Sequence, residues 1–397
     1  MKSYVGGITV PRPAAGGRMV PAGEGEAVAA TKGGLEDVVA CVTEICAIDG
    51  DAGRLLYRGY DVADLAENCS FDEVAYLLWR GSLPEPQDRE ALRTELRAAS
   101  SLPVPVRDFL ARLPRQRPMA ALRTAVSALE VLDPPAASGP EAGVAQAVRL
   151  TGQLAAVTAA WWRLGQGQEV LEPLPDLDHA AQFLYLLTGR VPDALAARAM
   201  NVAAVLHADH ELNASTFAAR VTAATLAGMH AAVTSAMGAL EGPLHGGANE
   251  AAMHTVDEVG SPERAQEWIS ARLAAGQRIP GFGHRVYHTV DPRAVVLARW
   301  AQRLGAQAGD LRGYETTVAM DNAMRRLRGL YPNLDLYSGD VYRQLGIPCA
   351  LFTPVFAVCR ISGWTAHVLE QYAHNRLIRP RARYVGAQLR QLAAGSR

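Results

Sequence analysis

Two histidines of this 397-residue chain stand beside glycines, in Gly242-Pro-Leu-His245-Gly-Gly247 and in Gly281-Phe-Gly283-His284-Arg285. Glycine permits backbone angles that other residues avoid and lets a ligand approach the main chain, so a histidine there is well placed to face a substrate. A turn histidine exposed to water is the plain alternative for either segment alone. Two such segments together favour a site for acid–base chemistry.

A loop aspartate, Asp335, lies downstream in Asn333-Leu-Asp-Leu-Tyr-Ser-Gly339. In such surroundings an aspartate often only forms a turn or caps a helix, and for Asp335 alone that structural role is favoured. Together with the two histidines it completes a candidate set of titratable groups.

The segment His207-Ala-Asp-His210-Glu211 raises a metal-site hypothesis. Its residue order is neither of the zinc-protease helix motifs, although two histidines three residues apart can share a helix face. Because a clear third ligand is missing, we expect no metal and keep a metal-dependent hydrolase as a remote alternative.

Arginine supplies nearly all the positive charge of the chain, and three arginines stand near the other candidates: Arg293, Arg360 and Arg379. Single arginines are usually solvated surface residues. A substrate with two carboxylates would nevertheless need a cluster of this kind, because guanidinium groups pair with carboxylates through two parallel hydrogen bonds.

The composition is that of an ordinary globular protein, with 49% hydrophobic and 20% charged residues. A formal net charge of −1 provides no general attraction to nucleic acid or to an anionic membrane, so neither is expected as a partner. Five scattered cysteines without zinc-site spacing indicate free thiols in a reducing cytoplasm, the expected location. Residues 1–32 lack a continuous apolar core and are predicted to form a flexible extension.

The uncharged stretch from Val221 to Leu240 is long enough to span a bilayer. Alanine, threonine, serine and glycine dominate it, however, and it contains His230. Small residues suit close helix packing inside a soluble protein or at a subunit interface, so no membrane span is expected.

The elements that must position these residues are mostly helical. Cys46–Ile48 and Leu55–Tyr57 are predicted to form a short β-hairpin around a glycine-rich turn. Helical spacing begins at Val62, and Ser70 with Glu73 predicts a capping box at the start of a helix. No repeat and no alternation of strands and helices typical of a dinucleotide fold is visible, so the predicted fold class is mainly α.

After Gly242 the composition changes to short Gly- and Pro-containing loops between helices. Residues 246–343 are therefore predicted to be a small domain, inserted into a large helical domain of residues 33–245 and 344–397. A cleft between two such domains is a natural catalytic site.

Taken together, these segments resemble the citrate synthase family, in its short, dimeric type. The most specific matches are Gly242-Pro-Leu-His-Gly-Gly-Ala-Asn-Glu250 and Gly281-Phe-Gly-His-Arg-Val-Tyr287. The likeness begins at Gly33-Gly-Leu-Glu-Asp-Val38, continues in Leu56-Tyr-Arg-Gly-Tyr-Asp61, and reaches Arg379-Pro-Arg-Ala-Arg-Tyr-Val-Gly386. The stretch 98–180 adds little to it.

The resemblance implies an acyltransferase that converts an acyl group into an alkyl group, condensing acetyl-CoA with oxaloacetate to give citrate and CoA. Asp335 would remove a proton from the acetyl methyl group. His245 would hydrogen-bond the thioester oxygen, and His284 would protonate or polarise the oxaloacetate ketone.

The resemblance also implies the binding residues. For oxaloacetate these are His210, Arg293, Arg360 and, from a second subunit, Arg379, with Asn213 and Phe356 as weaker candidates. The CoA site would be lined by Ile279, Pro280, Gly281, Phe282 and Gly283. A mostly α homodimer of two-domain subunits is implied. No tightly bound cofactor is implied, and acetyl-CoA is a co-substrate. Inhibition by NADH is not expected, because residues 1–32 do not resemble the extra domain of the hexameric members.

Two departures from the family pattern are mild: Leu336 stands where phenylalanine is frequent, and Cys359 where alanine is frequent. The nearest alternative is 2-methylcitrate synthase, which uses propionyl-CoA and shares the catalytic set. A non-catalytic helical scaffold is a further alternative, and it predicts no release of CoA from acetyl-CoA and oxaloacetate.

Overall fold

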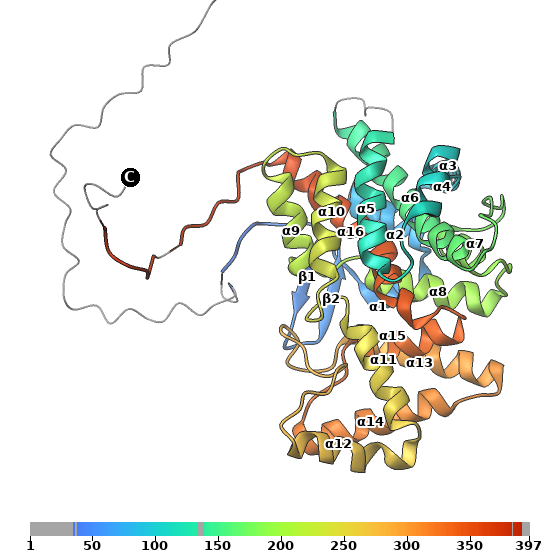
Figure 1. The fold of residues 1–397 in the computed structure, drawn as a ribbon, viewed down its shortest axis with the longest axis vertical. Helices are drawn as coiled ribbons and strands as arrows, with labels where there is room; N and C mark the ends of the chain where they lie inside the picture. The colour runs from blue at the N-terminus through green and yellow to red at the C-terminus, as the bar shows by residue number, and fades with distance from the viewer. Residues whose placement is uncertain (1–34, 36–37, 133–138, 383, 391–397) are drawn as a thin grey trace, which may run out of the picture. The chain divides into compact units, whose positions relative to one another are not determined.

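The computed structural model describes residues 35, 38–132, 139–382 and 384–390. The predicted extension of residues 1–32 lies outside the described residues. In the described part the chain forms sixteen α-helices and one small three-stranded sheet, which confirms the mainly α fold class (Figure 1).

The small sheet contains the predicted hairpin. β1 (Cys46–Asp49) pairs antiparallel with β2 (Arg54–Tyr57), and β3 (Tyr60–Asp61), which was not predicted, pairs with β2. Leu55 and Tyr57 of β2 are fully buried. Asp61 then caps α1 (Val62–Asn68) by accepting a hydrogen bond from the Ala63 amide.

The predicted capping box is present at α2 (Phe71–Arg80). The Ser70 hydroxyl accepts from the Glu73 amide, and the Glu73 carboxylate accepts from the Ser70 amide at 2.7 Å. Gly81 ends this helix in the left-handed region. The helices that follow are α3 (Pro86–Ala99), α4 (Val104–Arg112), α5 (Pro118–Leu132), α6 (Pro140–Gly165), α7 (His179–Thr188), α8 (Ala194–His207), α9 (Ala214–Ala223) and α10 (Met229–Leu240).

The uncharged stretch from Val221 to Leu240 is not one continuous helix. It contains the end of α9, a turn in which Leu226 has a positive φ of 65°, and α10. α9 and α10 pack against each other and against α16 (Phe352–Ala373). The stretch is therefore part of a helical hairpin packed against the rest of the fold.

α16 is the central helix of this part of the fold, and it contacts α2, α6, α8, α9 and α10 (Figure 1). The run Cys349–Ala373 is the one candidate for a membrane span among the described helices, by length and apolar composition. Of its most apolar window 89% is buried inside the fold, as in the core helix of a globular protein.

Residues 246–343 contribute a second group of helices, in which α13 packs on α15 and α12 on α14. α13 and α15 also contact α8, while α11 contacts α16, so the two groups meet at these helices. The described residues from Thr43 onward form one compact unit, and the division into a large and a small domain stays a prediction. The bounds of the second group are α11 (Ala248–Val259), α12 (Ala265–Ala274), α13 (Pro292–Ala308), α14 (Arg312–Arg328) and α15 (Leu334–Gln344), with 3₁₀ turns at Pro262–Arg264 and Cys349–Leu351.

Candidate active site

His245 lies in the tight turn between α10 and α11. Its amide donates to the Gly242 carbonyl at 2.9 Å, and the next amide, of Gly246, donates to the Leu240 carbonyl at 2.9 Å. A Cβ atom on Gly246 would lie 2.6 Å from that carbonyl oxygen, so this turn requires glycine at position 246. The glycine beside this histidine thus serves the backbone of the turn.

The His245 ring is held by Ser215, near the start of α9. Nε2 of His245 lies 2.8 Å from Ser215 Oγ, which also accepts from Nε1 of Trp364 at 3.0 Å. Ser215 Oγ donates to Oδ1 of Asn213 at 2.8 Å, and in the tautomer of His245 whose Nε2 accepts, the two acceptors share its single hydrogen. Burial and the nearby Arg360 charge lower the pKa of His245 to about 4, so its imidazole is neutral at pH 7.

His284 follows Gly283, whose φ is +76°. Its Nδ1 accepts hydrogen bonds from the amides of Val286 at 3.0 Å and Tyr287 at 3.2 Å. Burial and the Arg293 charge lower the pKa of His284 to about 4. A neutral imidazole whose Nδ1 accepts carries its hydrogen on Nε2, so His284 is a neutral donor.

His210 stands beside His284, with ring centroids 5.1 Å apart. Its Nε2 is 3.2 Å from the Tyr287 hydroxyl oxygen, and burial together with the charge of Arg293 lowers its pKa well below the ordinary range. Glu211, the next residue, has a positive φ of 50° and turns the chain away. The site therefore contains three neutral histidines.

Asp335 lies in the first turn of α15, where its amide donates to the capping side chain of Asn333 at 3.1 Å. Its Oδ1 is enclosed and has no hydrogen-bond partner among the described residues. Burial raises the pKa of Asp335 to about 7, although Arg293 and Arg360 oppose the shift. A carboxyl group with a pKa near 7 is suited to accept a proton at physiological pH.

Arg360 of α16 is 1% exposed. Its Nε donates to the His207 carbonyl, and its guanidinium carbon lies 4.8 Å from the centre of the Phe356 ring. Within the described ranges no carboxylate forms an ion pair with it, and burial lowers its pKa. A buried guanidinium that forms no ion pair is a candidate binding group for an anionic ligand.

Arg293 differs, because its guanidinium is already paired within the chain. Nε and Nη2 donate to the two oxygens of Asp291 at 3.0 and 2.8 Å. Asp291 also accepts from the Leu334 amide at 3.1 Å and so joins the start of α13 to the start of α15. Asp291 orients Arg293 and helps to fix the helix that carries Asp335.

The two arginines are the common neighbours of the candidate catalytic groups. The Arg360 charge acts on His245, His210 and Asp335. The Arg293 charge acts on His284, and likewise on His210 and Asp335. The fold thus brings together side chains from α15, α16 and three loops around two buried positive charges.

The loop of residues 279–283 pairs with the segment before α15. The Gly283 amide donates to the Tyr331 carbonyl at 2.9 Å, and the Asn333 amide donates to the Gly281 carbonyl at 3.0 Å. Beside this pairing lies a pocket of about 310 Å³, and His284, Tyr287 and Asp291 are among the residues that line it. The predicted CoA loop therefore adjoins both His284 and the start of the helix that carries Asp335.

Residues 34–381 match the family model described as "Citrate synthase, C-terminal domain". The chain belongs to the citrate synthase family. It is 47% identical over 362 residues to the citrate synthase of Haloferax volcanii, covering 89% of this chain and 96% of that protein. It is 40% identical over 364 residues to the 2-methylcitrate synthase of Shewanella oneidensis, covering 91% and 96%. These findings confirm the resemblance and show an enzyme of the acyltransferase type.

A solved citrate synthase from Thermoplasma acidophilum, a ternary complex with carboxymethyl coenzyme A and oxaloacetate, has a TM-score of 0.86 to this chain. The two sequences are 34% identical, and the match covers 90% of this chain and 97% of that one. A citrate synthase from Pyrobaculum aerophilum is similar, with a TM-score of 0.83, 38% identity and coverage of 91% and 94%. The fold class is therefore that of citrate synthases.

The remaining residues named from the sequence, Asn213, Arg379 and His207, have the following contacts. Asn213 caps α9, since its Oδ1 accepts from the Thr216 amide at 3.1 Å and its Nδ2 donates to the His210 carbonyl at 3.2 Å. Arg379 follows α16, is exposed, and makes no hydrogen bond or ion pair within the described segments. His207 is fully buried, and its Nδ1 donates to the Ala203 carbonyl at 2.7 Å.

The metal hypothesis finds no cluster in the structure. Among the residues that the structure describes, no group of three or more His, Cys, Asp or Glu side chains could hold a metal ion. His207 is instead a buried side chain hydrogen-bonded to the Ala203 carbonyl, and burial is the chief reason why its pKa is lowered to about 3.

Four residues of the site were missed from the sequence: Ser215, Tyr287, Asp291 and Trp364. Asp291 lies two residues before Arg293, and Tyr287 lies three residues after His284 in the same motif. The short spacing between Asp291 and Arg293 is a signal that could have been used. Ser215 and Trp364 are 149 residues apart, and no local pattern connects them with His245.

Proposed function

We propose that the chain condenses acetyl-CoA with oxaloacetate and hydrolyses the resulting thioester to citrate and CoA. The observation that carries this proposal is the buried Arg360, which forms no ion pair in the described part and lies among neutral histidines and a carboxyl group of pKa about 7. Such a site suits a small carboxylate substrate and the removal of a weakly acidic proton. Membership of the citrate synthase family supports it.

In the first step, Asp335 accepts a proton from the methyl group of acetyl-CoA as an enol or enolate forms. His245 donates from Nδ1 to the thioester oxygen, where negative charge develops. For a neutral His245 to donate from Nδ1, Nε2 must accept, so the Ser215 hydroxyl turns its hydrogen from Asn213 to His245. The short contacts of Ser215 with both acceptors support this exchange.

In the second step, the methyl carbon of the enol attacks the ketone carbon of oxaloacetate, and the ketone oxygen receives a proton. His284 donates to that oxygen from Nε2, because its Nδ1 is occupied by two backbone amides. Water then cleaves the citryl thioester, which releases citrate and CoA. No metal ion and no tightly bound cofactor is needed for these steps.

The oxo acid is held by Arg360, Arg293 and His210, whose neighbouring charges and ring contacts support a shared pocket. Phe356 lies against Arg360 and within 5.9 Å of the His245 ring centroid, so it shapes the pocket. Asn213 acts indirectly, through the capping of α9.

CoA is proposed to bind along residues 279–283, whose pairing with residues 331–333 supports a position next to Asp335. We further propose a cytoplasmic homodimer in which Arg379 reaches the site of the partner subunit. The exposed Arg379 and the match of residues 34–381, which include it, to the family model support this assembly. Closure of the small domain, residues 246–343, then excludes water from the enol.

The second candidate is 2-methylcitrate synthase, which the 40% identity to the Shewanella oneidensis protein favours. One methylene in a pocket is worth about 1–3 kcal/mol, or roughly ten- to 200-fold in kcat/KM. The test measures kcat/KM for acetyl-CoA and for propionyl-CoA at saturating oxaloacetate, by release of the CoA thiol. A preference for acetyl-CoA is expected, whereas a clear preference for propionyl-CoA would replace the first assignment with the second.

A further inference from the structure

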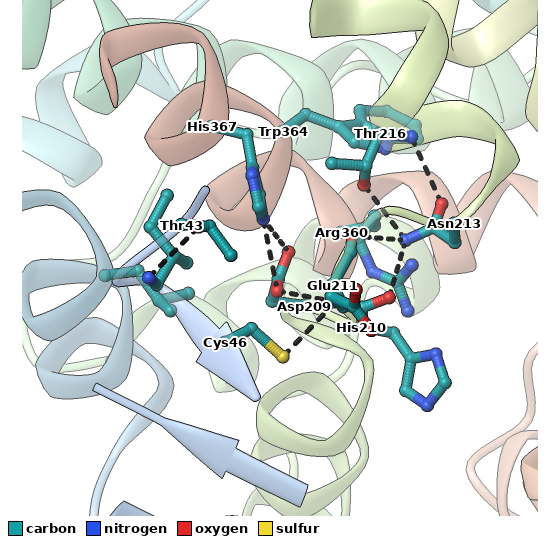
Figure 2. Close-up of polar contacts among 12 residues, drawn as sticks. Thr43, Cys46, Asp209, His210, Glu211, Asn213, Thr216, Arg360, Trp364 and His367 are labelled. Atoms are coloured by element: carbon teal, nitrogen blue, oxygen red, sulfur yellow. Dashed lines mark hydrogen bonds and ion pairs between the residues drawn. The ribbon is translucent and has the colours of Figure 1, made fainter. Parts of the chain in front are cut away.

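Three consecutive residues, from the last residue of α8 into the loop that follows it, are bonded to one face of α16. Nε of Arg360 donates to the His207 carbonyl, and the Gly363 amide donates to the Ala208 carbonyl at 3.0 Å. One turn further along, Nε2 of His367 lies 3.3 and 3.4 Å from the two carboxylate oxygens of Asp209 (Figure 2). Positions 360, 363 and 367 share a helix face, so α16 holds residues 207–209 in register.

The buried His367 connects this loop to a second helix. Nη1 of Arg220, in α9, lies 2.8 Å from Nδ1 of His367 and 2.6 Å from the Glu370 carboxylate. A guanidinium only donates, so Nδ1 accepts, and in the neutral ring the hydrogen lies on Nε2, which faces Asp209. Asp209 and His367 are both 0% exposed. Asp209 therefore has a donor whose tautomer is fixed from the opposite side.

Asp209 also fixes the turn that presents His210. Its Oδ2 accepts from the Glu211 amide at 3.0 Å, at the residue with the positive φ. Its backbone carbonyl accepts from the Tyr57 hydroxyl at 2.7 Å. Although burial alone raises the pKa of Asp209, the contacts with His367 and the Arg360 charge bring it below its ordinary value, so the group stays a carboxylate.

We propose that Asp209 and His367 are positioning residues of the oxo-acid site. They hold the loop so that His210, on the loop, and Arg360, on α16, face the same ligand. The proposal rests on the proposed function, because the ligand in question is oxaloacetate. The bond between Asp209 and His367 joins the two segments that carry His210 and Arg360, so its loss should weaken the binding of oxaloacetate. Other segments form the acyl-CoA half of the site.

The test compares variants of His367 in the full-length protein. His367→Leu removes both hydrogen bonds, whereas His367→Gln can still accept from Arg220 and donate to Asp209. Thr365→Val is the matched control, because Thr365 is equally buried in α16 but holds Trp79 on another face, at 2.9 Å. The readouts are kcat, the KM of each substrate, the Kd for oxaloacetate by calorimetry, and Tm.

We expect His367→Leu to raise the KM and Kd for oxaloacetate at least tenfold, to change the KM for acetyl-CoA less than twofold, and His367→Gln to restore most of the loss. Thr365→Val should lower Tm without a change in either KM. The proposal would be overturned if His367→Leu changed the KM for oxaloacetate and the KM for acetyl-CoA equally. It would also be overturned if Thr365→Val, at the same Tm as His367→Leu, lost affinity for oxaloacetate.

Two further comparisons keep the test decisive. If His367→Leu does not fold, His367→Gln is compared with Asp209→Asn, which keeps an acceptor for the Glu211 amide but loses the charge. Asp209→Asn should raise the Kd for oxaloacetate at least fivefold, and an unchanged Kd overturns the proposal. If the unmodified protein binds oxaloacetate but releases no CoA from acetyl-CoA, the proposed function has failed, while the Kd values still decide the role of the loop.

Discussion

The raised pKa of Asp335 predicts that the proposed base destabilises the folded protein at neutral and alkaline pH. An aspartate ionises near pH 3.8 in an unfolded chain, whereas the pKa of Asp335 in the folded protein is about 7. Between these two values the folded state binds the additional proton, so stability falls as the pH rises through the window and stays reduced above pH 7.

Asp335→Asn removes this penalty, because an amide is neutral at every pH. The difference of about three pKa units corresponds to at most about 4 kcal/mol at pH 8, and to about 2 kcal/mol between pH 5.5 and pH 7. With roughly 2 °C per kcal/mol for a large domain, the gain in Tm should be about 4 °C greater at pH 8 than at pH 5.5.

The assay is calorimetric unfolding of both proteins at pH 5.5 and pH 8, at one protein concentration and scan rate. The same variant should lose citrate formation and retain oxaloacetate binding, which serves as the control for an intact site. A gain in Tm that is equal at the two pH values would refute the reasoning about burial. Turnover near the wild-type rate would refute the assignment of the base.

Three further outcomes follow from the site. Because Asp335 must be ionised to accept a proton, kcat/KM for acetyl-CoA should fall about tenfold per pH unit below pH 7, and an acid limb that begins only below pH 5 would contradict this. Arg360→Leu should weaken oxaloacetate binding by about 3 kcal/mol, roughly a hundredfold in Kd by calorimetry; a change under threefold would show that Arg360 does not bind the oxo acid. Ser215→Ala should lower kcat roughly tenfold, since it removes the hydroxyl that lets His245 donate from Nδ1, with the KM for oxaloacetate unchanged. An unaltered kcat in steady-state assays would remove Ser215 from the mechanism.

The elements with strong local signals could be predicted from the sequence. The hairpin around residues 49–53 and the capping box of Ser70 and Glu73 depend on residues within a few positions of one another, and both are present. β3 has only two residues, too few for an alternating pattern to be visible.

Contacts between residues far apart in the sequence, which build the site, could not be predicted from local patterns. Asn213 has a local signal for a helix cap, since it is followed by Thr216 and caps α9, and it also accepts a hydrogen bond from Ser215. Its expected place in the substrate pocket stays a prediction. The pairing of Arg220 with His367 joins residues 147 positions apart, and their meeting depends on how α9 packs against α16. The predicted catalytic roles, and the contribution of Arg379 to a partner subunit, stay predictions.

The contact between Gly363 and Ala208 also limits how this protein can be engineered. Glycine inside a helix costs about 0.5–1 kcal/mol relative to alanine, which makes helical glycines attractive targets for thermostabilisation. A Cβ on Gly363 would lie 2.3 Å from the Ala208 carbonyl oxygen and 2.4 Å from the Asp209 carboxylate. At Gly143 in α6 it would meet only the end of the Leu369 side chain, which can rotate away. A library of alanine replacements can include Gly143. Gly363 must remain, because residues 208 and 209 pack directly against the helix backbone at this position.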